Sequence, residues 1–177
     1  MRRAVLDIET GGFSITKNGI CEIALLLIDD NCQVIDKFHA LIKPYKREDS
    51  DELVSYKEDA MELNGLSIEQ LMADGLPADE VAGELAKFII HHDINTIIGQ
   101  NSIAFDVPRI EYLLNRFAGI SISDIRNVDT MLLAKAKLNL PSYKLNVLCD
   151  HFGIENKREH TAVSDAEATL EVYKKLL

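Results

Sequence analysis

The sequence lacks any apolar run long enough to cross a membrane, and it is poor in cysteine and in basic residues. A membrane-spanning helix needs about 20 consecutive apolar residues, and no stretch of the chain approaches that length. The apolar run that follows Met1, Arg2 and Arg3 is also too short for the core of a secretory signal peptide. We therefore predict a cytoplasmic protein with no membrane partner.

Cysteine is scarce and scattered. The three cysteines, Cys21, Cys32 and Cys149, are odd in number and include no Cys-x-x-Cys pair. Such a set is typical neither of a disulfide framework nor of a zinc site. We expect three buried, reduced thiols.

Basic residues are outnumbered, with 19 Lys and Arg against 29 Asp and Glu, which gives a formal net charge of −10. Contacts to duplex phosphates require Lys and Arg, so this charge argues against tight, non-specific duplex binding. Carboxylates that cluster around metal ions, however, reverse the local charge once the ions bind. The composition therefore still allows an enzyme that binds the end of a nucleic-acid strand.

What is present indicates a folded globular protein, because 47% of the residues are hydrophobic and 27% are charged. A chain of 177 residues is long enough for one substantial core, so we expect a single domain over residues 1–177. Apolar patterning predicts an opening strand at 4–10 and further strands at 20–28, 33–42, 95–99 and 125–129. Helical spacing predicts helices at 77–92, 107–117, 130–138, 141–152 and 161–177, with shorter ones near residues 60 and 68. This order predicts an α/β fold, a mixed sheet with helices on its faces.

The opening strand carries two carboxylates, Asp7 and Glu9, in an otherwise apolar run. Alternate side chains of a strand point to the same face, so these two project together while Leu6 and Ile8 face away. A divalent cation such as Mg²⁺ relieves their mutual repulsion. The alternative for this stretch alone is an acidic pair at a solvated strand end.

Three later residues favour the metal site over the solvated acidic pair. Asp106 follows the fourth strand, Asp165 stands at the start of the last helix, and His160 precedes it by five residues. Singly, each has an ordinary explanation: a helix N-cap, a favourable first-turn charge and a surface histidine. Together with the first pair they make four carboxylates, the oxygen ligands that two Mg²⁺ or Mn²⁺ ions need for displacement at phosphorus. The histidine is a candidate general base for an attacking water.

These residues stand in motifs that resemble the DEDD superfamily of 3′→5′ exonucleases, in its histidine-containing (DnaQ-like, DEDDh) branch. The matching segments are Asp7-Ile8-Glu9-Thr10-Gly11 with Cys21-Glu22-Ile23-Ala24, Gly99-x-Asn101-x-x-x-Phe105-Asp106, Asp129-Thr130 and His160-x-Ala162-x-x-Asp165-Ala166. The resemblance runs from residue 3 to the C-terminus. It implies a ribonuclease H-like fold, a mixed five-stranded sheet with helices on both faces and the second strand antiparallel.

The resemblance also implies roles. Asp7, Glu9, Asp106 and Asp165 would be catalytic and would bind two Mg²⁺ (or Mn²⁺) ions. His160 would activate water to release nucleoside 5′-monophosphates from a 3′ end.

Substrate contacts are implied at further positions. Thr10 and Gly11 would meet the terminal sugar, and residues 59–67 look like the family's segment beside the terminal nucleotide. The residues expected to touch substrate are therefore Thr10, Gly11, Asp59, Asn64, Asn101 and Phe105. Many members have His where Asn64 stands. Phe13 and Phe105 are candidates for stacking on bases, with core packing as the alternative. Lys157 and Arg158 are candidates for phosphate contact, with a solvated turn as the alternative.

The resemblance predicts an exonuclease acting on single-stranded or frayed 3′ ends, with DNA favoured over RNA because this branch is rich in proofreading domains. One alternative is an exoribonuclease resembling ribonuclease T, against which the net charge argues. Another is a proofreading or accessory subunit whose partner is a DNA polymerase. A catalytically inactive scaffold is disfavoured by the intact acidic set. The oligomeric state is not predicted.

Overall fold

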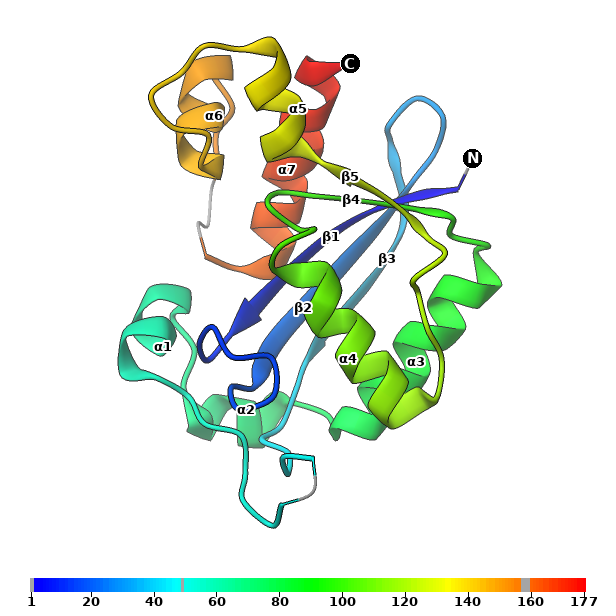
Figure 1. Cartoon of the computed structure of the whole chain (residues 1–177), viewed down its shortest axis with the longest axis vertical. Helices are drawn as coiled ribbons and strands as arrows, with labels where there is room; N and C mark the ends of the chain where they lie inside the picture. Colours follow the sequence, from blue (N-terminus) through cyan, green and yellow to red (C-terminus); the bar gives the residue numbers. More distant parts are fainter. Residues whose placement is uncertain (1, 49, 157–159) are drawn as a thin grey trace.

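The computed structural model describes residues 2–48, 50–156 and 160–177. Lys157 and Arg158, the candidates for phosphate contact, lie outside the described residues. Figure 1 shows the helices and strands of the chain.

Five strands form one sheet in the order β3-β2-β1-β4-β5. The strands are β1 (Arg3–Thr10), β2 (Ile20–Ile28), β3 (Val34–Leu41), β4 (Thr96–Gly99) and β5 (Arg126–Asp129). β2 runs antiparallel to both of its neighbours, whereas β1, β4 and β5 are parallel to one another. The predicted five-stranded mixed sheet with a reversed second strand is confirmed.

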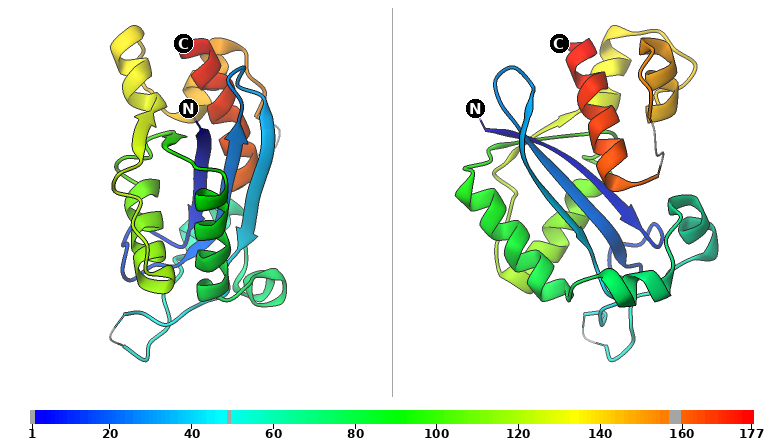
Figure 2. Two further views of the ribbon diagram at one scale, coloured as in Figure 1. Left: turned by 90° about the vertical axis from the view of Figure 1, so that its right-hand side faces the viewer. Right: turned by 180° about the vertical axis from the view of Figure 1, so that it is seen from behind.

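The helices are α1 (Glu58–Asn64), α2 (Ile68–Asp74), α3 (Ala78–His91), α4 (Asp106–Ala118), α5 (Thr130–Lys137), α6 (Leu145–Phe152) and α7 (Ala162–Leu176). The two views of Figure 2 show helices on both faces of the sheet, as predicted. Ser67 caps α2 by accepting the amide of Gln70, and Gly119 ends α4 with a φ of 67° that favours glycine.

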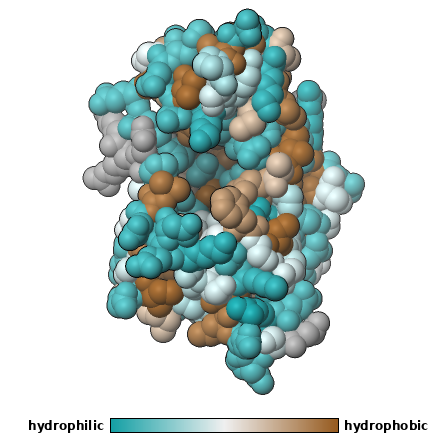
Figure 3. Space-filling view, turned by 60° about the vertical axis from the view of Figure 1, so that its left-hand side comes forward, coloured by the Kyte–Doolittle hydropathy of each residue, from teal (hydrophilic) through white to brown (hydrophobic). Residues whose placement is uncertain are grey.

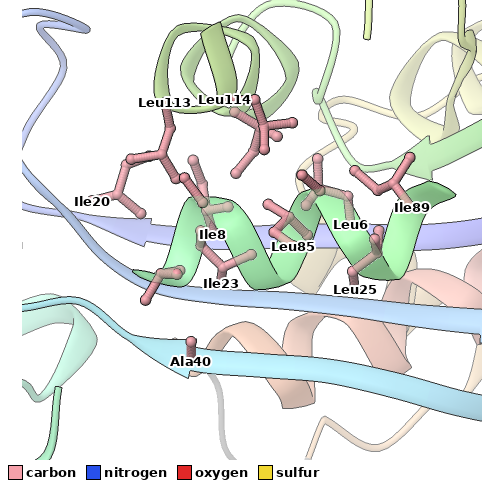
Figure 4. Packing of buried hydrophobic residues seen from close by; sticks show 14 of the residues in the cluster. Leu6, Ile8, Ile20, Ile23, Leu25, Ala40, Leu85, Ile89, Leu113 and Leu114 are labelled. Carbon is pink, nitrogen blue, oxygen red and sulfur yellow. The ribbon is translucent and has the colours of Figure 1, made fainter. Parts of the chain in front are cut away.

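The pleat of β1 divides its side chains between two cores. Leu6 and Ile8 pack with Leu85 of α3 and Leu113 of α4 (Figure 4). Val5, on the opposite face, packs with Leu170 and other side chains of α7. Because side chains alternate along a strand, Asp7 and Glu9 lie on the face covered by α7.

One predicted helix is shorter than expected, since residues 141–144 are not helical and α6 begins at Leu145. The cause is Tyr143, whose hydroxyl donates to the carbonyl of Leu138 and accepts the amide of Leu140. The carbonyl of Tyr143 also accepts a bond from the side chain of Gln100. These contacts hold the segment before α6 in a non-helical conformation.

All three cysteines are buried, as predicted. Within the ranges that the structure describes, no helix combines the length and the apolar character needed to cross a membrane.

Candidate active site

Three carboxylates meet beside the end of β1. Asp7 and Glu9 come from β1 and Asp165 from the first turn of α7. Each offers an oxygen atom, and these atoms all lie within 4.8 Å of one another. All three side chains are half-buried, so the cluster can be reached from solvent.

Asp106 joins this cluster from another element. It is the first residue of α4 rather than its N-cap, which is Phe105. Its Oδ1 accepts the amide N–H of Ile8, between Asp7 and Glu9, at 3.1 Å. The fourth predicted carboxylate is therefore buried against the backbone that carries the first two.

The electrostatics of the cluster favour a bound cation. Burial, together with the charge of Asp106, raises the pKa of Asp7 well above its ordinary value. Burial and the charges of Asp165 and Glu22 raise the pKa of Glu9 to about 8. Burial also raises the pKa of Asp106 to about 7, against hydrogen bonds from backbone amides and the nearby charge of Arg109.

Four mutually repelling carboxylates with oxygen donors alone make a set that fits hard divalent cations. The residues present therefore fit the metal site that the motifs predicted.

His160 stands next to Asp165 in a short loop before α7. Its backbone amide donates to Oδ2 of Asp165 at 3.3 Å, and its φ of 67° lies in the left-handed region. The side-chain amide of Asn156 donates to Oδ1 of Asp165 at 2.6 Å and accepts a bond from the hydroxyl of Ser164. Because Ser164 fixes which way that amide faces, Asn156 orients a metal-ligand candidate.

A pocket of about 330 Å³ opens at this loop and reaches α1 and α6. Its lining residues are Leu63, Lys144, Leu145, Asn146, Asn156, His160 and Asp165. Figure 3 shows this side of the molecule, with a recess across the middle of the face.

The sequence reasoning did not assign a role to Glu22. This residue is 6% exposed on β2, directly opposite Glu9. One oxygen accepts the amide of Ala162 at 3.0 Å and the other lies 2.7 Å from Nε2 of His39. Glu22 thus joins the start of α7 to the sheet. A signal was available, since Glu22 is the one charged residue in the apolar run 20–28.

A second, smaller pocket of about 190 Å³ lies beyond Glu9. Its lining residues are Ile8, Glu9, Thr10, Gly12, Phe13, Lys57, Asp59, Ala60, Leu63 and Phe105. Three of the predicted substrate contacts, Thr10, Asp59 and Phe105, are therefore brought together here. Phe13 is 78% exposed at the rim.

The other predicted contacts do not line this pocket. Gly11 uses its amide and carbonyl in bonds to Gly19 and Lys57. Asn64 is 5% exposed, and its side chain donates to the carbonyl of Thr10 and accepts the amide of Leu66. Neither residue lines the small pocket.

Asn101 lies in the loop between β4 and α4, with a φ of 56°. Its amide donates to Asp129 at 3.0 Å, and Ile103 donates to the other oxygen of that carboxylate. Asp129 also caps α5. The Asp129-Thr130 element therefore holds the loop that leads to Asp106.

Comparison with known proteins decides the family. A family model described as an exonuclease, RNase T, matches residues 4–173. The chain belongs to the RNase T exonuclease family. The DEDD superfamily predicted from the motifs is thereby confirmed, and so is the class of enzyme, a nuclease that hydrolyses phosphodiester bonds. The family depends on divalent metal ions.

The exonuclease is 33% identical to a PolC-type DNA polymerase III of Clostridium perfringens over 96% of this chain and 11% of that protein. It is 30% identical to the 3′-5′ exonuclease DinG of Bacillus subtilis over 99% of this chain and 18% of that protein. The chain thus spans less than a fifth of the length of these relatives.

Among solved structures, Escherichia coli exonuclease I in complex with a dT13 oligonucleotide superposes on this exonuclease with a TM-score of 0.78. The identity is 22%, and the match covers 99% of this chain and 40% of the other. This likeness confirms the ribonuclease H-like exonuclease fold that the motifs predicted.

Proposed function

We propose that this protein is a 3′→5′ exonuclease that removes nucleoside 5′-monophosphates from single-stranded or frayed DNA ends, using two Mg²⁺ or Mn²⁺ ions. The observation that carries the proposal is the convergence of Asp7, Glu9 and Asp165 within 4.8 Å, with Asp106 bonded to the backbone between the first two. His160, the one histidine of the predicted set, is bonded through its amide to this cluster.

In this mechanism Asp7, Glu9, Asp106 and Asp165 would hold the ions. When bound, the ions stabilise negative charge on the phosphate oxygens in the transition state. His160 takes the proton of the attacking water as a general base. Asn156 and Glu22 keep Asp165 and the start of α7 in place for this step.

The small pocket is the proposed site for the 3′-terminal base. Phe13, Phe105 and Leu63 line it with apolar side chains suited to a stacked base. Glu9 lines the pocket and belongs to the carboxylate cluster, so the phosphodiester of a base bound here would lie near the cluster. Lys57 and Asp59 supply polar groups at its edge.

DNA is the proposed substrate class because two of the similar proteins are associated with DNA by their names. One is a DNA polymerase, and the other is an exonuclease in complex with a dT13 oligonucleotide. The similarity to PolC-type polymerases favours a second candidate, proofreading in association with a DNA polymerase.

The test uses one 5′-labelled single strand made as DNA and as RNA, incubated with Mg²⁺ or Mn²⁺. We expect a stepwise ladder of shortened DNA that disappears with EDTA and is strongly reduced in His160→Ala. The matched control is His91→Ala, an exposed histidine at the end of α3, on the opposite face of the sheet. Uncut DNA, internal cuts, or equal rates in the two histidine variants would overturn the mechanism, and faster cleavage of RNA would overturn the substrate.

A further inference from the structure

We propose that Arg109 is a positioning residue that holds Phe13 and Phe105 against the 3′-terminal base, and this inference rests on the proposed exonuclease function. Arg109 lies on α4, one turn after Phe105. It is 5% exposed and does not line the small pocket. Any effect on substrate must therefore pass through neighbouring residues.

The guanidinium of Arg109 joins two segments that are far apart in the sequence. One nitrogen donates to the carbonyl of Phe105 at 2.6 Å, and the other donates to the carbonyl of Phe13. The planar guanidinium also lies 3.6 Å from the centre of the Phe105 ring. One side chain thus binds both backbones and one aromatic face, which only arginine's flat fork of donors can do.

The two phenylalanines form the wall of the pocket that Arg109 supports. Their rings meet edge to face, with centroids 6.2 Å apart and an angle of 81° between planes. Both line the pocket, yet Phe13 is 78% exposed and has little packing of its own to fix it. A solvent-exposed ring opposite a base needs a firmly held backbone if it is to stack.

The loop that carries Phe13 is also anchored within itself, including at the peptide unit between Phe13 and Ser14. The amide of Gly11 bonds to the carbonyl of Gly19, and the amide of Ser14 bonds to the side chain of Asn18. The bond from Arg109 to Phe13 connects this loop to α4. Without Arg109 we expect the bonds of Gly11 and Ser14 to remain, whereas the Phe13 ring loses its fixed position.

Arg109 also stands near Asp106, whose carboxylate attracts its positive charge. This raises a competing explanation, in which Arg109 acts on the metal-ligand candidate rather than on the aromatic wall. The two explanations predict different kinetics. Loss of wall support weakens binding of a terminal base, whereas a disturbed Asp106 slows hydrolysis of every 3′ end.

The test compares two single-stranded DNA oligonucleotides that differ only at the 3′ terminus, one ending in thymidine and one in an abasic deoxyribose. For Arg109→Gln we expect KM for the thymidine end to rise about 10-fold, within the range that stacking of one base supports. We expect kcat to stay within about 2-fold, and KM for the abasic end to be unchanged. Added to Phe13→Ala, the substitution should produce no further rise in KM.

The matched control is Arg116→Gln. Arg116 stands on the same helix and makes the same kinds of contact, to the carbonyl of Lys46 and the ring of Phe117. It should leave both KM values unchanged. Arg109→Lys keeps the positive charge near Asp106 but lacks the two-pronged guanidinium, so it should raise KM for the thymidine end and leave kcat unchanged. If Arg109→Gln fails to fold, Arg109→Lys replaces it in the test.

An equal fall in kcat on both ends, or an equal rise in KM on both, would overturn the inference. So would an unchanged KM for the thymidine end in Arg109→Gln or Arg109→Lys. These outcomes differ from failure of the proposed function, in which the unaltered protein would shorten neither oligonucleotide.

Discussion

The carboxylate cluster should make the metal-free protein less stable as the pH rises, and Glu9→Gln should remove part of that loss. The pKa of Glu9 rises from 4.5 to about 8 on folding. Between those values the unfolded chain has released the proton while the folded chain retains it. The free energy of unfolding therefore falls as pH rises through this range, and the stabilising contribution is complete only below about pH 4.5.

The magnitude follows from the size of the shift. Each pKa unit corresponds to about 1.4 kcal/mol, so the full shift is equivalent to ~5 kcal/mol. Glu9 is half-buried, and solvent screening reduces the effect to ~2 kcal/mol. For a chain of this length we expect Glu9→Gln to raise the melting temperature at pH 8.5 by roughly 4–8 °C, with a much smaller difference at pH 5.

The assay is thermal unfolding followed by circular dichroism in EDTA at both pH values. Glu62→Gln, an exposed carboxylate on α1, is the matched control and should show no such gain. Adding Mg²⁺ or Mn²⁺ at pH 8.5 should stabilise the unaltered protein more than the variant. If Glu9→Gln melts at or below the temperature of the unaltered protein at pH 8.5, the carboxylates do not repel one another as inferred.

Three further substitutions separate the roles of other residues. His160→Ala should lower kcat by ~10²–10⁴-fold without altering the rise in melting temperature that Mn²⁺ causes. If Mn²⁺ no longer raises the melting temperature of the variant, His160 is a metal ligand instead. Glu22→Ala should lower kcat by ~10–100-fold, since the amide of Ala162 loses its acceptor; single-turnover cleavage measures it, and unchanged cleavage contradicts the role. Asp129→Ala should cost ~2–4 kcal/mol in urea unfolding because four backbone amides lose their acceptor, and a loss under ~1 kcal/mol would contradict that reading.

Much of the site was predictable because its pattern is local. The alternation of Leu6, Asp7, Ile8 and Glu9 decides which face of β1 is acidic, since the pleat leaves a strand no other choice. Asp165 and His160 are close in the sequence and therefore close in space. The order of strands and helices followed from apolar spacing for the same reason.

What sequence reasoning missed depends on contacts between distant segments. Arg109 is an ordinary helix residue until α4 packs beside the loop of Phe13. The bonds from the side chain of Asn64 to the backbone of Thr10 and Leu66 were not foreseen. The late start of α6 depends on the hydroxyl of Tyr143. No periodicity in a sequence encodes such pairings.

The distribution of the carboxylates along the chain has a consequence for synthesis. Asp7 and Asp165 stand 158 positions apart, so Asp165 leaves the ribosome well after Asp7. A nascent chain lacks the third member of the cluster until α7 has been made and has docked on β1 and β2. Contacts of such long sequence separation form late in folding. A nascent chain in which α7 has not yet been made is therefore without the complete carboxylate cluster.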